Sequence, residues 1–217
     1  MIQFDNVSYT YEKGGGVSNV NITVQDDEYV FLIGPTGSGK TTLLRLAYMQ
    51  LLPKVGRVVV NKYDSSKIKP KKIPYFRRNI GMVFQDYRLL NDRNLFENIA
   101  LPLHVMGFQK DEIIDRVTES LEEIGLESKS DHYPNELSGG EQQKACVARA
   151  LIKDPDIILA DEPTGNLDPV TSFELIKLLE EINREGTSIL MASHNYNLIK
   201  GRGHRIIEIQ NGIVRKS

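Results

Sequence analysis

The sequence contains no tryptophan and a single cysteine, Cys146. One cysteine cannot form an internal disulfide, so a disulfide-stapled fold is excluded, and this usage is typical of a reducing compartment. Cys146 falls at an apolar position of a predicted helix. We therefore expect it to be a small buried side chain rather than a reactive thiol.

Long hydrophobic runs are also missing. The longest, such as Tyr29–Ile33 and Ile157–Ala160, are the length of strands and far short of the roughly 20 residues that a membrane span needs. The first residues, Met-Ile-Gln-Phe-Asp-Asn, do not follow the pattern of a signal peptide. We expect a chain that does not cross a membrane by itself.

Charge of one sign is not in large excess. The formal net charge is -2 over 217 residues, which argues against a protein that binds nucleic acid along its whole surface. A hydrophobic content of 40% is enough for a sizeable core. The length predicts one large α/β domain, or one such domain with a subdomain.

Hydrophobic patterning divides the chain into strands and helices. Ile2 and Phe4, and then Val20, Ile22 and Val24, alternate with polar residues as in antiparallel strands with one buried face. Tyr29–Ile33 is continuously apolar, which is typical of a buried central strand. Further predicted strands are Val58–Val60, Ile157–Ala160, Ser188–Ala192, and the hairpin strands Arg205–Ile209 and Ile213–Arg215 around Asn211-Gly212.

Helical periodicity appears in four segments. Thr41–Leu51 is predicted to be a helix that stops before Pro53. Asp111–Ile124 is expected to bury Ile113, Ile114, Val117, Leu121 and Ile124 on one face, with a stop at Gly125. A third helix follows Gly140 and runs to about Lys153. A fourth, closed by Gly186, is expected to face inward with Phe173, Ile176, Leu179 and Ile182.

The predicted central strand runs into a glycine-rich loop with the pattern GxxxxGKT. Its residues are Gly34, Pro35, Thr36, Gly37, Ser38, Gly39, Lys40 and Thr41, followed by Thr42. Glycines let backbone N–H groups curl around phosphate oxygens, and the following helix start favours negative charge. Lys40 is expected to reach the β- and γ-phosphates and the Thr41 hydroxyl to ligate Mg²⁺. An ordinary glycine-rich turn would lack this strand-loop-helix context.

Polar side chains follow three other predicted strands. Asp161 and Glu162 directly follow Ile157–Ala160, at the strand end that faces the same crevice as the phosphate loop. Asp161 is expected to hold Mg²⁺ and Glu162 to polarise the attacking water, whereas a solvated acidic loop is the alternative reading. Gln85 is expected to touch Mg²⁺ or water, and His194 the γ-phosphate or water. His104, His132 and His204 lack such context and are interpreted as structural.

A second glycine-rich motif, LSGGEQQK, spans Leu137–Lys144. Ser138 and Gly140 precede a predicted helix and so form a second anion-binding helix start. One subunit needs only one phosphate loop, which leaves the role of this motif unexplained within a single chain.

Together the phosphate loop, the LSGGEQQK motif and the strand ending in Asp161-Glu162 resemble the nucleotide-binding subunit of an ATP-binding cassette (ABC) complex, over nearly the whole chain. The resemblance implies a P-loop NTPase (RecA-like) α/β core with an N-terminal antiparallel β lobe and a helical subdomain insert. On this reading residues 1–217 are one ABC ATPase domain, with lobe and core in 1–86 and 151–217 and the helical subdomain in 87–150.

The same resemblance implies roles for further residues. The chain would hydrolyse ATP with Mg²⁺ and form a head-to-tail homodimer around two ATP molecules, in which Ser138 and Gly140 close over the γ-phosphate of the other subunit. Asp168 matches the loop that runs along this interface. Tyr11 matches an aromatic residue that stacks on adenine in this family. Tyr9 is the other candidate for that role, and the alternative is that Tyr11 is an ordinary tyrosine on the face of a strand.

Two segments bear on the branch of the family. Asp161–Asp168, DEPTGNLD, is similar to the branch of lipoprotein-release ATPases, MacB-type exporters and FtsE-type cell-division ATPases. Val83–Leu90, VFQDYRLL, with Asn91–Asn98 after it, is most similar to the FtsE type, and this region implies contact with a membrane partner.

An FtsE-type role implies an FtsX-like permease, possible division-machinery proteins, and a peripheral position on the cytoplasmic side of the inner membrane. A transport ATPase is the alternative, and a soluble ABC protein acting on ribosomes or DNA is the third. No direct nucleic acid is expected. The basic run from Lys67 to Arg78 is either a solvated loop or a contact for anionic lipid.

Overall fold

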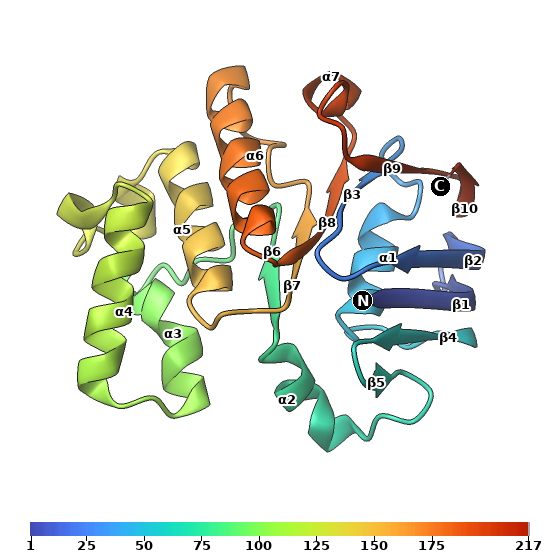
Figure 1. Cartoon of the computed structure of the whole chain (residues 1–217), viewed down its shortest axis with the longest axis horizontal. Coiled ribbons are helices and arrows are strands. Elements are labelled where there is room, and N and C mark those ends of the chain that lie inside the picture. The colour runs from blue at the N-terminus through green and yellow to red at the C-terminus, as the bar shows by residue number, and fades with distance from the viewer. Residues whose placement is uncertain (217) are drawn as a thin grey trace.

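The computed structural model describes residues 1–216 and contains two β-sheets with helices around them (Figure 1). The strands are β1 (Ile2–Thr10), β2 (Gly16–Val24), β3 (Tyr29–Ile33), β4 (Val55–Val60), β5 (Tyr63–Asp64), β6 (Ile80–Val83), β7 (Ile157–Asp161), β8 (Ser188–Ser193), β9 (Arg205–Gln210) and β10 (Ile213–Lys216). The helices are α1 (Lys40–Ala47), α2 (Ile73–Arg77), α3 (Leu95–Met106), α4 (Lys110–Glu123), α5 (Gly139–Leu151), α6 (Pro169–Arg184) and α7 (Tyr196–Ile199).

The smaller sheet is antiparallel, with the strand order β2-β1-β4-β5. Ile2 pairs with Val24 on one side and with Val60 on the other. The alternating apolar residues at the start of the chain face the core, as their period of two predicts. This sheet is the N-terminal β lobe expected from the sequence.

The larger sheet has the order β10-β9-β3-β8-β7-β6. Strands β9 through β6 run parallel, and β10 joins as an antiparallel edge through the predicted Asn211-Gly212 hairpin. Strand β3 lies between β8 and β9 and both its faces are buried, which explains its continuous apolar sequence. Because β3, β7 and β8 are parallel neighbours, the residues that follow them share one edge.

Three clusters of buried residues hold these layers together. One lies between the antiparallel sheet, α1 and one face of the larger sheet, and it includes Phe4, Leu44 and Leu190. A second lies on the opposite face, beneath α5 and α6. Figure 1 shows α1 and the antiparallel strands on one side of the parallel strands, and α5 and α6 on the other.

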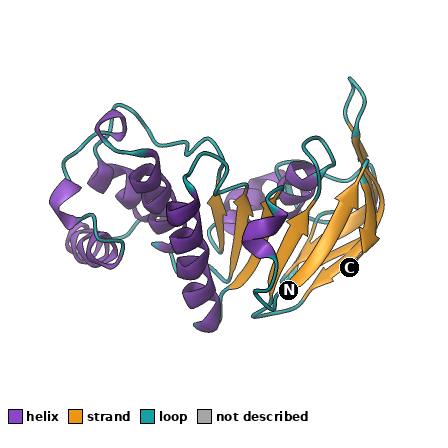
Figure 2. Ribbon diagram, turned by 90° about the horizontal axis from the view of Figure 1, so that it is seen from above, coloured by secondary structure: helices purple, strands orange, loops and turns teal. Residues whose placement is uncertain are grey.

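Helices α3, α4 and α5 share a third cluster of their own, which includes Leu103, Val117 and Ala148. In Figure 2 helices gather at one end of the molecule and strands at the other. Helix α5 also contributes Val147 to the cluster beneath the larger sheet, so it joins the helical part to the core. The P-loop NTPase fold with a β lobe and a helical part is therefore as predicted, while the exact division at residues 87 and 150 stays a prediction.

Some local expectations were wrong. The helix predicted over Thr41–Leu51 ends at Ala47, because Met49 takes a left-handed conformation with φ 51°. Phe173 is exposed, since its ring faces the cations of Lys177 at 4.9 Å and Arg202 at 4.8 Å. Ile114 is also exposed, on the flank of α4 next to the buried positions of its stripe.

Cys146 is buried, and burial raises the pKa of its thiol to about 12, so it is not a reactive thiolate. Within residues 1–216, every helix is too short or too polar to cross a membrane.

Candidate functional site

The glycine-rich loop connects β3 to α1 and is braced by the C-terminal hairpin. A Cβ at Gly34 would lie 2.1 Å from the Ile209 carbonyl oxygen, so only glycine fits there. The N–H of Gly212 donates to the Ser38 carbonyl at 2.8 Å. The loop is therefore shaped by its own glycines and by a strand more than 160 residues away.

Lys40 begins α1 and its ammonium group is buried inside the loop. The Nζ atom donates to the carbonyl oxygens of Gly34 at 2.8 Å and Pro35 at 3.2 Å. It also lies 3.1 Å from Oε1 of Glu162, and the Lys40 side chain is 3% exposed. A buried cation held by backbone carbonyls and a carboxylate is in position to exchange them for phosphate oxygens.

Thr41 and Asp161 meet across 120 positions of sequence. The Thr41 hydroxyl donates to Oδ1 of Asp161 at 3.0 Å. Burial raises the pKa of the Asp161 carboxyl, while the hydrogen bond from Thr41 opposes that shift. A hydroxyl and a carboxyl supply oxygen atoms, which are the ligands that a hard cation prefers.

Glu162 and His194 lie side by side at the ends of β7 and β8. Nδ1 of His194 lies 2.6 Å from Oε2 of Glu162. The backbone of Glu162 is left-handed, with φ 46°, which is uncommon for a residue other than glycine. A cavity of about 150 Å³ adjoins the pair and is large enough for several water molecules.

Gln85 lies in the loop after β6 and is exposed. Its Nε2 lies 3.5 Å from the position that a Cβ on Gly165 would take. Its backbone carbonyl accepts a hydrogen bond from Asn166 Nδ2 at 3.4 Å. Among residues 1–216, no hydrogen bond joins the Gln85 side chain to Thr41 or Asp161. Gln85 therefore lies against the loop that follows β7 and does not contact Thr41 or Asp161.

Tyr11 follows β1 and stands at the start of α1. Its hydroxyl lies 3.4 Å from Oγ1 of Thr42, and its ring packs edge-on against Tyr9 at 5.0 Å between centroids. Tyr11 is half-buried, so part of the ring is open to a ligand. This proximity to α1 favours Tyr11 as the expected adenine platform.

Ser138 is the N-cap of α5 in a capping box. Its backbone N–H donates to Oε2 of Glu141 at 2.8 Å and its hydroxyl donates to the same oxygen at 2.9 Å. Lys129 pairs with the other carboxylate oxygen of Glu141. The hydrogen bond from Lys129 and the backbone N–H of Ser138 lower the pKa of Glu141 to about 2.

Gly140 and Asp168 are linked through one residue of α6. A Cβ on Gly140 would lie 2.8 Å from Cγ2 of Thr171. Asp168 caps α6 by accepting from the backbone N–H of Thr171 at 3.1 Å, and it also accepts from the Thr171 hydroxyl. The second glycine-rich motif and the Asp168 loop therefore form one surface.

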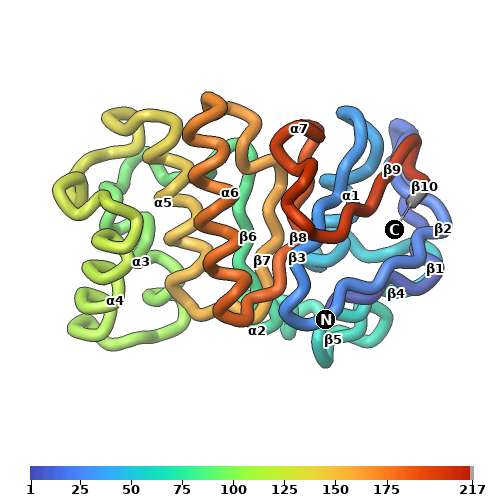
Figure 3. Tube along the Cα trace, turned by 45° about the horizontal axis from the view of Figure 1, so that its top comes forward, coloured from blue at the N-terminus to red at the C-terminus, as the bar shows by residue number. Residues whose placement is uncertain are grey.

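That surface does not meet the phosphate loop within the chain. Figures 1 and 3 both show α5 and α1 separated by the strands β6, β7 and β8. Lys40, Thr41, Asp161, Glu162 and His194 form one group, and Ser138, Gly140 and Asp168 form another. Within one chain, helix α5, which begins at the second glycine-rich motif, therefore lies apart from α1 and the phosphate loop.

The phosphate loop fits a polyphosphate on two observations. The Ser38 hydroxyl is buried and finds no hydrogen-bond partner among the described residues. Gly37 has open space on its Cβ side. As for Mg²⁺, residues 1–216 contain no cluster of three His, Cys, Asp or Glu side chains able to hold a metal, so phosphate and water oxygens would have to complete its shell.

Two positioning residues were missed at the sequence level. Glu141 could have been found, because Ser138 and Glu141 have the spacing of a capping box. Arg149 could not: it donates to the carbonyls of Tyr87 at 2.7 Å and Arg88 at 2.6 Å, a long-range contact. Through it, α5 holds the loop that begins with Gln85.

The chain is similar to known proteins over nearly its whole length. The family model described as ABC transporter matches residues 17–165. The cell division ATP-binding protein FtsE of Bacillus subtilis (strain 168) is 42% identical over 99% of this chain and 94% of its own. FtsE of Escherichia coli (strain K12) is 42% identical over 98% of this chain and 96% of its own. The dimeric cassette MJ0796, in a post-hydrolysis state bound to ADP and Pi, superposes with TM-score 0.91 at 34% identity, covering 100% of this chain and 97% of its own.

Proposed function

This chain belongs to the ABC transporter family, and from that membership we propose that it is an FtsE-type ATPase subunit that drives a membrane partner by ATP-dependent dimer closure. The observation that carries the proposal is the grouping of Lys40, Thr41, Asp161, Glu162 and His194 at one edge of the sheet, apart from Ser138 and Gly140. A site split in this way becomes complete only between two subunits.

Nucleotide binding rests on the phosphate loop and Tyr11. The N–H groups of residues 36 to 42 and the Ser38 hydroxyl would surround the phosphates, and Lys40 would exchange its carbonyl contacts for the β- and γ-phosphates. Tyr11 would stack on adenine, held near α1 by its contact with Thr42. The open phosphate loop and the partly exposed Tyr11 ring both support nucleotide binding here.

Mg²⁺ would be held by Thr41, by Asp161 directly or through water, and by Gln85 when its loop approaches. Their oxygen ligands suit this ion, which would neutralise phosphate charge when bound. Gln85 is exposed and touches the loop after Glu162. This position supports a role for Gln85 as a sensor that approaches the Mg²⁺ site when α5 moves.

For hydrolysis, Glu162 would accept the hydrogen bond of the attacking water and His194 would orient that water or the γ-phosphate. The contact of 2.6 Å between them fixes both side chains beside a cavity of about 150 Å³. The contact between Lys40 and Glu162 supports the same arrangement, because it places the carboxylate next to the group expected on the γ-phosphate.

Dimer closure would bring Ser138, Gly140 and Asp168 of one subunit over the nucleotide of its partner. The start of α5 offers backbone N–H groups to a γ-phosphate, and this contact is made only in the closed state. ATP would therefore favour closure and hydrolysis would release it. The dimeric neighbour bound to ADP and Pi supports this cycle.

The cellular role of the ATPase is inferred from its relatives. FtsE proteins at 42% identity over nearly the full chain favour a role in cell division, with an FtsX-like permease on the cytoplasmic side of the inner membrane and regulation of cell-wall hydrolysis. Residues 83–98 would contact that permease. A transport ATPase of the lipoprotein-release or MacB type would use the same chemistry with another partner.

The test is a pull-down with the Glu162→Gln variant. We would capture it with Mg-ATP from detergent-solubilised native membranes and identify partners by mass spectrometry. An FtsX-like membrane protein with division or cell-wall factors is the expected result. A lipoprotein-release or exporter permease would leave the site assignments in place and overturn the division role.

A matched capture separates nucleotide-driven binding from background. The Lys40→Ala variant, or Glu162→Gln without nucleotide, should recover less partner if the closed dimer is what the partner holds. Equal recovery in all three samples would contradict the coupling of closure to the partner.

A further inference from the structure

A basic face formed by residues 67–78 remains outside the site described above. This segment carries four lysines and two arginines and no acidic residue, in a chain whose formal net charge is -2. It runs from β5 through the short helical turn Pro70–Lys72 to α2, which Figure 1 shows projecting beyond the sheets. Such a local excess of one charge needs an explanation other than bulk composition.

The structure divides these six cations into two kinds. Arg77 is a structural residue, because it donates to the carbonyls of Tyr48 at 3.2 Å and Met49 at 3.1 Å and covers the Tyr48 ring. Arg78 reaches the Val105 carbonyl at 3.4 Å. The four lysines are exposed instead: Lys67, Lys69, Lys71 and Lys72.

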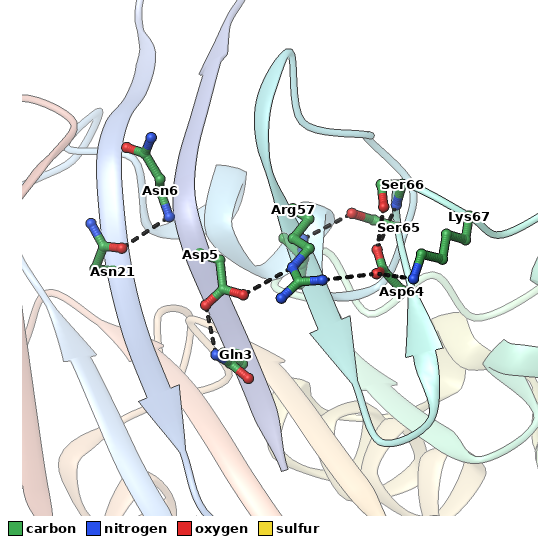
Figure 4. Close-up of polar contacts among 10 residues, drawn as sticks. Gln3, Asp5, Asn6, Asn21, Arg57, Asp64, Ser65, Ser66 and Lys67 are labelled. Carbon is green, nitrogen blue, oxygen red and sulfur yellow. Dashed lines mark hydrogen bonds and ion pairs between the residues drawn. The ribbon is translucent and has the colours of Figure 1, made fainter.

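Acidic partners for these lysines are scarce. Lys67 lies 3.9 Å from Asp64, which already accepts from Ser66 and from Arg57 (Figure 4). Elsewhere in residues 1–216, no carboxylate lies within ion-pair distance of Lys69, Lys71 or Lys72. Their charge is therefore available to an external anion.

An aromatic side chain stands among these cations. The Tyr75 ring is 53% exposed, with the Lys72 ammonium 5.4 Å and the Arg78 guanidinium 4.8 Å from its centroid. Tyrosine at the edge of a basic surface suits the boundary between lipid headgroups and acyl chains, because its ring is apolar and its hydroxyl is polar.

The inner side of α2 packs against the core. Phe76 is fully buried and packs edge-on against Tyr63 at 5.2 Å between centroids, while Ile73 packs on the core beneath the antiparallel sheet. These inward contacts and Arg77 fix α2, so the lysines and Tyr75 point outward from a preformed surface. Ordering the segment would cost little when a partner binds.

We propose that Lys67, Lys69, Lys71, Lys72 and Tyr75 form a docking surface for anionic phospholipid headgroups. A planar anionic membrane matches several exposed ammonium groups with one interfacial aromatic, and attraction at this range falls off within a Debye length. This contact goes beyond the proposed subunit-partner interaction, since it needs neither ATP nor the permease. It would orient the ATPase against the bilayer.

The test is vesicle flotation with the purified chain. Binding to vesicles of about 30% phosphatidylglycerol in phosphatidylcholine is compared with pure phosphatidylcholine, at about 50 mM and about 300 mM NaCl. Wild type should bind the anionic vesicles at low salt and lose most of that binding at high salt. Changing all four lysines to Gln should lower partitioning by about a hundredfold or more, and Tyr75→Ala by several-fold.

The matched control removes the same charge elsewhere. Lys54, Lys110, Lys177 and Lys200 are exposed, and their joint change to Gln should leave vesicle binding close to wild type. An equal loss in both quadruple variants, or wild-type binding by the Lys67–Lys72 variant, would overturn the proposal. So would tight binding to single-stranded RNA with no binding to vesicles, which would assign the surface to nucleic acid.

Failure of this proposal can be told apart from failure of the proposed function. The Lys67–Lys72 variant should keep wild-type ATP turnover, because these side chains lie outside the phosphate site. Lys40→Ala should bind ATP much more weakly and still float with anionic vesicles. If Lys40→Ala lost vesicle binding, the surface would depend on the nucleotide state and the independent lipid contact would be wrong.

Discussion

Nδ1 of His194 lies 2.6 Å from Oε2 of Glu162, although 32 positions separate the two residues in sequence. They meet because β7 and β8 are parallel neighbours in register, with Asp161 opposite Ala192. Each residue is the first one after the end of its strand. The contact joins a carboxyl group to an imidazole, two side chains that commonly act as general acids or bases.

Glu162→Gln is expected to keep ATP binding and lose turnover by about a hundredfold or more, since the amide cannot accept a proton from water. The variant should accumulate as a closed dimer with Mg-ATP. Phosphate release and size-exclusion chromatography would measure the two effects. Glu119→Gln changes an exposed residue of α4 and is the control, which should behave as wild type. Near-normal turnover would remove Glu162 from its proposed role.

Lys40→Ala is expected to weaken ATP binding by about ten- to a hundredfold, as for a lost hydrogen bond to a charged group. It would also leave Glu162 without its cation at 3.1 Å. Titration calorimetry with ATP would measure the affinity. Exposed Lys13→Ala serves as the control. An affinity equal to wild type would contradict the phosphate role of Lys40.

Ser138→Ala should prevent closure while the monomer still binds nucleotide. It also removes an N-cap, at a cost of about 1 kcal/mol or about 2–4 °C in melting temperature. Asn94→Ala removes the N-cap of α3, which has the same capping box, and so matches the stability loss. Asn94→Ala should still dimerise with Mg-ATP in the Glu162→Gln background. If Ser138→Ala dimerised equally well, the contact between subunits would be disproved.

Glu141→Gln should lower stability in a pH-dependent way. The folded pKa of Glu141 is about 2, below its ordinary value of 4.5, so its stabilising effect is present above about 4.5 and is lost as pH falls toward 2. The pair with Lys129 is partly exposed, and we expect a difference of only about 1 kcal/mol at pH 7. Urea unfolding at pH 7 and pH 4 would show this difference narrowing at the lower pH.

A double-mutant cycle sharpens that measurement. Lys129→Met alone should cost a similar amount at pH 7, and the double variant should cost less than the sum of the two. Strict additivity would mean that the contact between Lys129 and Glu141 contributes nothing, whatever its geometry.

Much of the fold and most of the nucleotide site could be predicted because their signals are local. The alternation before Val24, the apolar run Tyr29–Ile33 and the fixed glycine spacing depend on adjacent residues alone. Phe173 was wrongly assigned to the core, because its periodicity could not reveal that Lys177 and Arg202 would lie against its ring. Arg149 was missed for the same reason, as its partners are two carbonyls about 60 positions away.

The brace between the C-terminal hairpin and the glycine-rich loop has a consequence for how the chain acquires its shape. Ile209 and Gly212 are synthesised long after Gly34 and Ser38, which they contact. A growing chain that stops before Arg205 would carry the full phosphate-binding motif without the strand that confines it. The phosphate loop would thus take its final shape only late in translation, once the C-terminal hairpin has been made.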